Sequence, residues 1–418
     1  MDHDRDPLPW LALPGGMRDL VPPSASERRD LETELLELLR LSGYALVTTP
    51  PFEHEEVLEP ALRTEDRDLL RFVEPESGKV ALLRPDITPQ VARVIATRLA
   101  DRPPPHRLCY LGTVVRQRHG RARRHRQISQ LGLECVGLGA PEADLEVIEL
   151  AASLVRRAGV SDAKLELRLT GFGSLLLQQV DPGRREDVRR ALIRKDRSDV
   201  ERLSESEAPA LRTSLIGLTE LYGGAEVLDA AKEIAKGEAE EALGGLRSLV
   251  DALADRELGL ELCFDLGEIS AMSYYTGPSF VILAEGPGTP IGAGGRYDDL
   301  LPTLGVPYGA VGFAVDLDSL AWAKRHVQAE QPGTGDGVLL VGPEDASRRL
   351  SRSLRGHGIR AAVHSHGDPL EYASAWGFSA VGELRSKGTV RVQRVLGGEP
   401  AELTEEPIEA LVRFLKSQ

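Results

Sequence analysis

Cysteine and long apolar runs are scarce in this chain. The three cysteines, Cys109, Cys135 and Cys263, lie far apart and form no CxxC pair, which predicts reduced thiols rather than a disulfide framework or a metal site. No apolar run approaches the roughly 18 residues that a membrane-spanning helix needs. The first ten residues, MDHDRDPLPW, are acidic and differ from a basic and apolar signal peptide. We therefore expect a cytoplasmic protein that does not associate with membranes.

Positive charge is also in deficit, except in one segment. The 51 basic residues face 65 acidic ones, and the formal net charge is −14. Such a surface is not broadly attracted to nucleic acid or anionic lipid, so any anion site must be local. The segment VRQRHGRARRHRQ, residues 115–127, nevertheless holds six arginines, two histidines and no acidic residue. The composition, 41% hydrophobic and 28% charged, is typical of a soluble globular protein.

Local patterns predict both helices and strands in the N-terminal part of the chain. Pro89 suits the first position of a helix, for which Thr88 is the expected N-cap. Residues 108–116 and 126–136 are expected to pair as a hairpin, with the arginine-rich segment at its tip. The N-terminal part is therefore expected to combine α and β structure.

Composition divides the rest of the chain. Residues 172–257 have helical periods and little strand character, which predicts an inserted helical subdomain. Strand patterns return afterwards, so residues 1–171 and 258–328 are expected to form one core. The segment HVQAEQPGTGDG is typical of a linker. Strands and helices alternate over residues 335–418, which predicts a small C-terminal α/β domain.

Charged and polar residues converge on the predicted hairpin. Alternation along its second strand places Gln130, Gly132 and Glu134 on one face, and Gly132 leaves room for a ligand on the sheet. Arg116 ends the partner strand and suits a carboxylate or phosphate, whereas Asp86 and Glu134 suit an ammonium or a protonated ring. Together these groups complement a zwitterionic amino acid. Taken by their charges alone, they could equally be separate surface salt bridges.

Seven short motifs occur in order over residues 13–325. They are PGGMRD, the proline of TTPPFE, LRPDIT, YLGTVVR followed fourteen residues after its arginine by QLGLE, SYYTG, GGRYDDLL and AVGFAV. In order and spacing this set closely resembles class II histidine-tRNA ligases. The resemblance implies an α+β fold with a class II aminoacyl-tRNA synthetase-like antiparallel sheet flanked by helices. It also implies a dimer formed through the first motif and a histidine pocket on the sheet.

The resemblance also assigns the residues of that pocket. Carried over by position, the histidine-binding residues would be Asp86, Thr88, Arg116, Gln130, Glu134, Tyr274, Tyr275 and Tyr297. The charge pattern of the hairpin and the family motifs thus both indicate histidine as the ligand.

Three positions depart from the ligase pattern, and all three handle ATP in that family. Ligases read RGLDYYTG where this chain has SAMSYYTG, so Ser270 replaces the catalytic arginine. Ser319 stands where the last motif ends in an arginine, and Arg118 replaces a glutamate beside the ATP base. Adenylation needs preorganised charges around the phosphates. Their loss is expected to abolish useful catalysis, so no catalytic residue is assigned.

A kept amino-acid pocket with lost ATP residues resembles the regulatory subunit of ATP phosphoribosyltransferase, a paralogue of the ligases. That resemblance implies a non-catalytic chain without a cofactor that binds L-histidine. It further implies that the chain activates or feedback-regulates the short catalytic subunit in the first step of histidine biosynthesis, as a homodimer within a hetero-oligomer.

Two other interpretations remain. The chain could be an active histidine-tRNA ligase, which the three replacements oppose. It could also be a ligase-like protein with another regulatory task, such as sensing uncharged tRNA. The domain at 335–418 resembles the ligases' anticodon-binding domain but holds eleven basic and eleven acidic residues, so it shows no electrostatic footprint for tRNA.

The remaining motifs carry weaker signals. GAGG at 292–295 is expected between strands, which disfavours dinucleotide binding. HSH at 364–366 lacks a matching ligand set, so we interpret it as surface and assign no metal. The arginines of the hairpin tip, among them Arg121, Arg123 and Arg124, are either a solvated relic of the ligase ancestor or a docking patch for an acidic surface of the catalytic partner.

Overall fold

The fold was established from a computed structural model, which describes residues 11–59, 69–116, 125–269, 275–327, 337–385, 389–397, 399–403 and 407–416. The chain divides into two compact units. One comprises Met1–Asp19 and Asp30–Val327, and the other comprises Leu20–Arg29 and Gln328–Gln418. Within the described ranges, no helix combines the length and the apolar character that a bilayer crossing requires.

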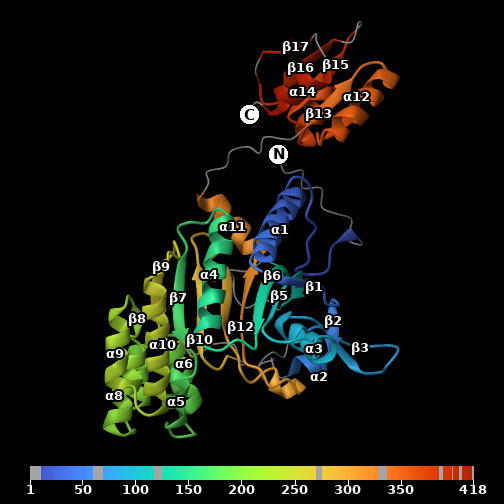
Figure 1. The fold of residues 1–418 in the computed structure, drawn as a ribbon. Coiled ribbons are helices and arrows are strands. Elements are labelled where there is room, and N and C mark those ends of the chain that lie inside the picture. The colour runs from blue at the N-terminus through green and yellow to red at the C-terminus, as the bar shows by residue number, and fades with distance from the viewer. Residues whose placement is uncertain are drawn as a thin grey trace. The chain divides into compact units, whose positions relative to one another are not determined.

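A nine-stranded sheet organises the first unit, in the order β1-β5-β6-β12-β11-β10-β7-β9-β8 (Figure 1). Its strands are β1 (Ala45–Val47), β5 (His106–Val115), β6 (Gln127–Val136), β7 (Lys164–Leu169), β8 (Tyr222–Gly223), β9 (Glu261–Asp265), β10 (Pro278–Leu283), β11 (Gly292–Arg296) and β12 (Ala310–Asp316). All pairings from β5 across to β7 are antiparallel. The predicted antiparallel sheet is confirmed, and β1 and β9 extend it by parallel pairing at either end.

Helices flank this sheet, as predicted. They are α1 (Ser24–Leu41), α2 (Glu55–Leu58), α3 (Thr88–Arg98), α4 (Glu142–Arg157), α5 (Phe172–Gln178), α6 (Arg185–Ile193), α7 (Arg197–Leu203), α8 (Pro209–Leu218), α9 (Glu226–Ile234), α10 (Glu238–Ala254), α11 (Leu317–Val327) and the 3₁₀ helix η3 (Pro302–Leu304). A small sheet of β2 (Phe52–His54), β4 (Val80–Leu83) and β3 (Arg71–Val73) accompanies α2 and α3. In Figure 1, α5, α6, α8, α9 and α10 gather beside β7, β8 and β9.

The two faces of the sheet bury different clusters. Leu131, Leu133 and Cys135 of β6 point into the main core, which α1 and α4 cover. Their neighbours Ile128 and Val136 point the opposite way, into a second cluster with residues of α3. Because alternate residues of a strand face opposite sides, the second face also receives the polar residues of β6.

The second unit is a small α/β domain. Its sheet has the order β14-β13-β15-β16-β17, with β13 parallel to both of its neighbours. The strands are β13 (Val338–Val341), β14 (Ala361–Val363), β15 (Ala380–Leu384), β16 (Val390–Arg394) and β17 (Ala401–Leu403), and the helices are α12 (Glu344–Gly356), α13 (Pro369–Ala375) and α14 (Pro407–Lys416).

One local prediction was wrong. Thr88 lies inside the first turn of α3, and Ile87 takes the N-cap position without a side-chain cap. Residues 292–295 belong to β11, which lies between β10 and β12 in the sheet, so the glycines do not connect a strand to a helix.

A buried ion pair joins the sheet to α4, and its loss should destabilise the fold. Arg296 donates through Nε and Nη2 to the carboxylate of Asp144, and the two side chains are 10% and 5% exposed. Asp144→Asn leaves a buried guanidinium without its main counter-charge, which typically costs ~3 kcal/mol of unfolding free energy. Urea denaturation followed by circular dichroism measures this loss.

The matched control removes a carboxylate from an exposed pair. Glu37 pairs with Arg40 on α1, with side chains 50% and 66% exposed, so Glu37→Gln should leave the unfolding midpoint unchanged. Equal midpoints for Asp144→Asn and Glu37→Gln would show that the pair between α4 and β11 contributes nothing.

Candidate functional site

A cavity of about 180 Å³ opens on the face of the sheet that α3 covers. This volume is below the roughly 300–1,000 Å³ of sites for drug-sized ligands, so it suits a molecule as small as an amino acid. The predicted histidine-pocket residues that line it are Asp86, Thr88, Arg116, Gln130, Glu134, Tyr275 and Tyr297. The eighth, Tyr274, falls outside the described residues.

Small residues form the floor of the cavity. Gly312 of β12 lies opposite Glu134 of β6, and a Cβ atom on Gly312 would lie 1.7 Å from the carboxylate oxygen Oε2. The expectation that Gly132 leaves room for a ligand was wrong. The ring of Tyr110 occupies that space, since a Cβ atom on Gly132 would lie 2.3 Å from the tyrosine hydroxyl. Glycine therefore makes room here for neighbouring side chains of the protein.

The most buried carboxyl group of the cavity belongs to Glu134, which is 1% exposed. Its Oε1 accepts hydrogen bonds from Thr88 Oγ1 at 2.7 Å and Tyr110 OH at 3.3 Å, and its Oε2 accepts one from Tyr297 OH. Burial raises the pKa of Glu134 to about 8, although the hydrogen bonds from Tyr297 and Thr88 oppose the rise. A pKa raised this far favours the protonated carboxyl of Glu134 near neutral pH.

A second polar group lies at the start of α3. Asp86 Oδ1 accepts from the Ile87 amide at 2.8 Å and from Gln130 Nε2 at 3.1 Å. Arg116 Nη2 lies 3.9 Å from the same oxygen, while Arg116 Nε donates to the Pro85 carbonyl at 2.6 Å. Gln130 Oε1 is buried and meets no donor among the described residues. A ligand N–H group would satisfy this acceptor.

The cavity thus combines acceptors for N–H groups with one cation. Glu134, Asp86 and the amide oxygen of Gln130 accept hydrogen bonds, and the guanidinium of Arg116 offers a fork for a carboxylate. Over the described part of the chain, no three histidine, cysteine or acidic side chains cluster closely enough to hold a metal ion. The arrangement suits binding of a small molecule that carries both N–H donors and an anionic group.

Sequence reasoning missed two residues of this site. Tyr110 is 1% exposed and contacts Thr88 and Glu134, and its position opposite Gly132 on the paired strand was the available signal. Asp316 lines the cavity and accepts from the amides of Asp318 and Ser319 at 2.9 and 3.2 Å. Tyr110 acts through partners on neighbouring elements, which a pattern within one strand does not reveal. Asp316 instead bonds to residues two and three positions ahead, so its place directly before α11 was the available signal.

Of the three replacements at ATP-handling positions, only Ser319 lies among the described residues. Ser319 lies in the first turn of α11, and its hydroxyl donates to Asp316 Oδ2 at 3.0 Å. A serine therefore bonds to its own turn at the position where the ligases carry an arginine. Arg118, Ser270 and the arginines of the hairpin tip at 121, 123 and 124 lie outside the described residues.

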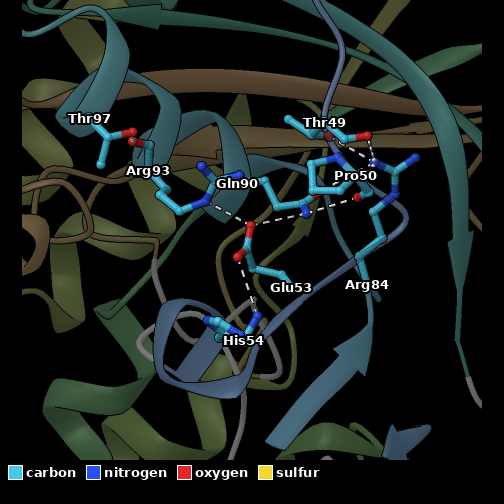
Figure 2. Close-up of polar contacts among 8 residues, drawn as sticks. All are labelled: Thr49, Pro50, Glu53, His54, Arg84, Gln90, Arg93 and Thr97. Carbon is cyan, nitrogen blue, oxygen red and sulfur yellow. Dashed lines mark hydrogen bonds and ion pairs between the residues drawn. The ribbon is translucent and has the colours of Figure 1, made fainter. Parts of the chain in front are cut away.

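A buried arginine, Arg84, fixes the segment that leads into the site (Figure 2). It is 6% exposed, and its Nη1 donates to the Thr49 carbonyl and hydroxyl at 3.0 and 2.8 Å and to the Pro50 carbonyl at 3.0 Å. Nη1 also donates to Gln90 Oε1 at 3.3 Å, and Nε donates to the Thr113 carbonyl at 2.8 Å. No carboxylate among the described residues pairs with this guanidinium. Hydrogen bonds to uncharged acceptors, most of them backbone carbonyls, stabilise its charge instead.

The network continues from Gln90 to the small sheet. Gln90 Nε2 donates to the Pro50 carbonyl at 3.0 Å and to Glu53 Oε2 at 3.3 Å. Arg93 Nε donates to the same carboxylate oxygen at 2.7 Å, as Figure 2 shows. This hydrogen-bond network connects residues 49–53 to α3 and β5, and these segments surround the turn that carries Asp86.

Comparisons with known proteins identify relatives of two kinds. The family model for histidyl-tRNA synthetase matches residues 16–320. The chain is 33% identical to the ATP phosphoribosyltransferase regulatory subunit of Geobacter sulfurreducens, over 86% of this chain and 85% of that protein. It is also 33% identical to the regulatory subunit of Syntrophotalea carbinolica, over 94% and 98%. A crystal structure from Bacillus halodurans, described as an ATP phosphoribosyltransferase regulatory subunit/histidyl-tRNA synthetase, superposes with a TM-score of 0.78 at 29% identity, over 89% of this chain and 97% of that one.

The raised pKa of Glu134 predicts a specific pH dependence of stability. The folded-state pKa is about 8, whereas an unfolded glutamate has a pKa of about 4.3. The stabilising contribution of the protonated carboxyl is complete below the unfolded value and disappears as the pH rises through the folded value. Between pH 5.5 and 7.5 the protein without ligand should lose about 2.5 kcal/mol of unfolding free energy relative to Glu134→Gln, which cannot ionise.

Denaturant titrations of both proteins at the two pH values provide the measurement. Comparison with Glu134→Gln cancels the other titrating groups, which the two proteins share. Parallel pH profiles would mean that Glu134 has an ordinary pKa in the folded state.

Proposed function

Because the chain belongs to the family of ATP phosphoribosyltransferase regulatory subunits, we propose that it is the non-catalytic, histidine-binding subunit that regulates the short catalytic subunit in the first step of histidine biosynthesis. One observation carries the proposal. The cavity brings together residues that were assigned to a histidine pocket on sequence motifs alone, including Asp86, Gln130 and Glu134. We assign this role to residues 1–171 and 258–328.

The chemistry of the cavity suits histidine because this ligand has N–H donors at two places and a carboxylate. Glu134, Asp86 and Gln130 Oε1 accept from the ammonium and the imidazole, and Arg116 pairs with the carboxylate. Burial keeps the pKa of Glu134 near 8, so a cationic ligand favours the ionised carboxyl and displaces its proton. Binding is therefore coupled to proton release from Glu134.

A non-catalytic role agrees with the ATP-handling positions. Adenylation requires cations around the phosphates, and Ser319 directs its hydroxyl to Asp316 at one of these positions. Arg118 and Ser270 are replacements of the same kind in the sequence. The second candidate, an active histidine-tRNA ligase, has the match to the histidyl-tRNA synthetase family in its favour. Histidine-dependent exchange of pyrophosphate into ATP separates the two, since only a ligase catalyses it.

We expect L-histidine to bind and Glu134→Gln to weaken the binding. The substitution removes the negative charge that meets a ligand cation in a buried site, so the affinity should fall at least roughly tenfold by isothermal titration calorimetry. Glu166→Gln is the matched control, because Glu166 lies on β7 outside the cavity and pairs with Arg168. Its affinity should equal that of the wild type.

The same titrations are run with and without the catalytic subunit, so that a pocket completed by the partner is detected. If histidine gave no heat in either setting, or if Glu134→Gln titrated like the wild type, the pocket assignment would be wrong.

The regulatory role predicts a hetero-oligomer with altered turnover. Mixed with a short ATP phosphoribosyltransferase from the same organism, the chain should co-elute with it on size-exclusion chromatography and change its rate. Histidine should alter that rate only when the chain is present, because coupling requires a site for histidine and a second site for the partner. Glu134→Gln should still form the complex but respond less to histidine.

A catalytic subunit that ran equally fast alone, with the same histidine response, would refute the regulatory role. Pyrophosphate exchange by the purified chain at a ligase-like rate would favour the ligase instead.

A further inference from the structure

Tyr110 lies behind the carboxyl group of Glu134 and does not itself line the core cavity. It is on β5 directly opposite Gly132 of β6, and a Cβ atom on Gly132 would lie 2.3 Å from both the Cζ atom and the hydroxyl oxygen of the tyrosine. The side chain is 1% exposed and belongs to the cluster that contains Val91 and Ile95 of α3. The paired strands and this cluster hold the ring in place, so its hydroxyl acts on the cavity through other residues.

The hydroxyl of Tyr110 completes a set of donors around the Glu134 carboxyl. Oε1 accepts from Thr88 Oγ1 at 2.7 Å and from Tyr110 OH at 3.3 Å, and Oε2 accepts from Tyr297 OH. Because the carboxyl is almost fully buried, these hydroxyls replace the water that would solvate its charge. Hydrogen bonds to an ionised group stabilise the ionised form. Removal of one hydroxyl therefore favours the protonated carboxyl.

The contact between Tyr110 and Thr88 suits both protonation states of Glu134. Their hydroxyl oxygens are 3.4 Å apart, and either can be the donor. An ionised carboxylate only accepts hydrogen bonds, whereas a protonated carboxyl also donates one. Tyr110 donates to Glu134 when the carboxyl is ionised; when it is protonated, Tyr110 accepts from it and donates to Thr88. Rotation of a hydroxyl is sufficient for this exchange, so the carboxyl changes its charge without a movement of heavy atoms.

Glu134 also faces groups that a ligand contacts directly. The titratable and charged side chains that line the cavity with it are Asp86, Arg116, Tyr275, Tyr297 and Asp316. The charge of Asp86 opposes ionisation of Glu134, and the hydroxyl of Tyr297 favours it. A ligand in the cavity meets both of these residues. Tyr110, outside the lining, keeps its contact with Glu134 whether or not a ligand is bound.

We propose that Tyr110 is a positioning residue for histidine binding, whose hydroxyl holds Glu134 ready to ionise when the ligand cation arrives. The inference rests on the proposed function, since it takes L-histidine as the ligand. Burial raises the pKa of Glu134 to about 8, and the hydrogen bond from Tyr110 opposes the rise. At a pH below this value, binding of a cation removes the proton of Glu134, and the hydroxyl makes that step easier. At a higher pH, the hydrogen bond to the carboxylate exists before and after binding and leaves the affinity unaffected.

The test measures L-histidine binding by Tyr110→Phe, which keeps the ring and removes the hydroxyl. At pH 6.5 the Kd should rise roughly tenfold, the effect of about one hydrogen bond to a charged group. At pH 9.5 the Kd should rise less than about twofold, because Glu134 is then ionised without ligand. In a Glu134→Gln background, the same substitution should leave the Kd unchanged at both pH values, since no carboxylate remains.

Tyr44→Phe is the matched control. The side chain of Tyr44 is also buried, and its hydroxyl donates to a glutamate, Glu146 Oε1, at 2.8 Å. It belongs to the main core rather than to the cluster behind the cavity. This variant loses the same kind of hydrogen bond and should bind histidine like the wild type at both pH values.

A second measurement requires no histidine. The stability of the wild type relative to Glu134→Gln falls as the pH rises and levels off above the folded-state pKa of Glu134. The stability of Tyr110→Phe relative to Tyr110→Phe/Glu134→Gln should level off about one pH unit higher, because the carboxylate has lost a donor. Denaturant titrations of the four proteins between pH 5.5 and 9.5 measure both curves.

Three binding results would overturn the proposal: an unchanged Kd of Tyr110→Phe at pH 6.5, equal losses of affinity at pH 6.5 and 9.5, or the same loss in the Glu134→Gln background. If the wild type binds no histidine, the proposed function fails, and the stability curves decide what Tyr110 does. A shift of about one pH unit would then support its action on Glu134. Curves that level off at the same pH would refute that action.

Discussion

The shape of the core cavity depends on the buried guanidinium of Arg84. Through Nη1 and Nε it binds the carbonyls of Thr49 and Pro50 in one segment and of Thr113 on β5 in another. Its Nη2 occupies the space above Gly112, where a Cβ atom would lie only 2.1 Å away. An arginine is suited to this role because its planar fork satisfies several carbonyls at once. The protein's own hydrogen bonds therefore hold the turn that follows Arg84, and with it Asp86, in place.

The cavity that this turn completes is set up to respond to charge. Burial and the nearby Asp86 favour the protonated form of Glu134, whereas the hydroxyls of Tyr297 and Thr88 favour the ionised form. A balance of this kind is easily shifted by a ligand that brings a cation or N–H donors. For a subunit whose proposed task is to report the presence of histidine, such a poised carboxyl is more useful than one that is always ionised.

Sequence predicted most of this site because alternation along β6 and the motif positions fix which side chains share a face. Gln130 and Glu134 were found by that rule. The errors arise where a contact distant in sequence decides: the hydroxyl of Thr88 bonds to Glu134 instead of capping α3, and Tyr110 fills the space at Gly132. Arg84 was missed for the same reason, because most of its partners are backbone carbonyls, which no residue pattern reveals. The role of Tyr274 stays a prediction.

The pairing of β6 with β12 has a consequence for how the protein is made. β6 ends at Val136, but its partner β12 begins only at Ala310. While the ribosome synthesises the residues between them, one edge of β6 has no strand to pair with. An unpaired edge invites pairing with other chains, so the nascent protein needs protection by its own helices or by a chaperone. Glu134 can pack opposite Gly312 only after this stage, so the cavity between β6 and β12 is one of the last features of the core to form.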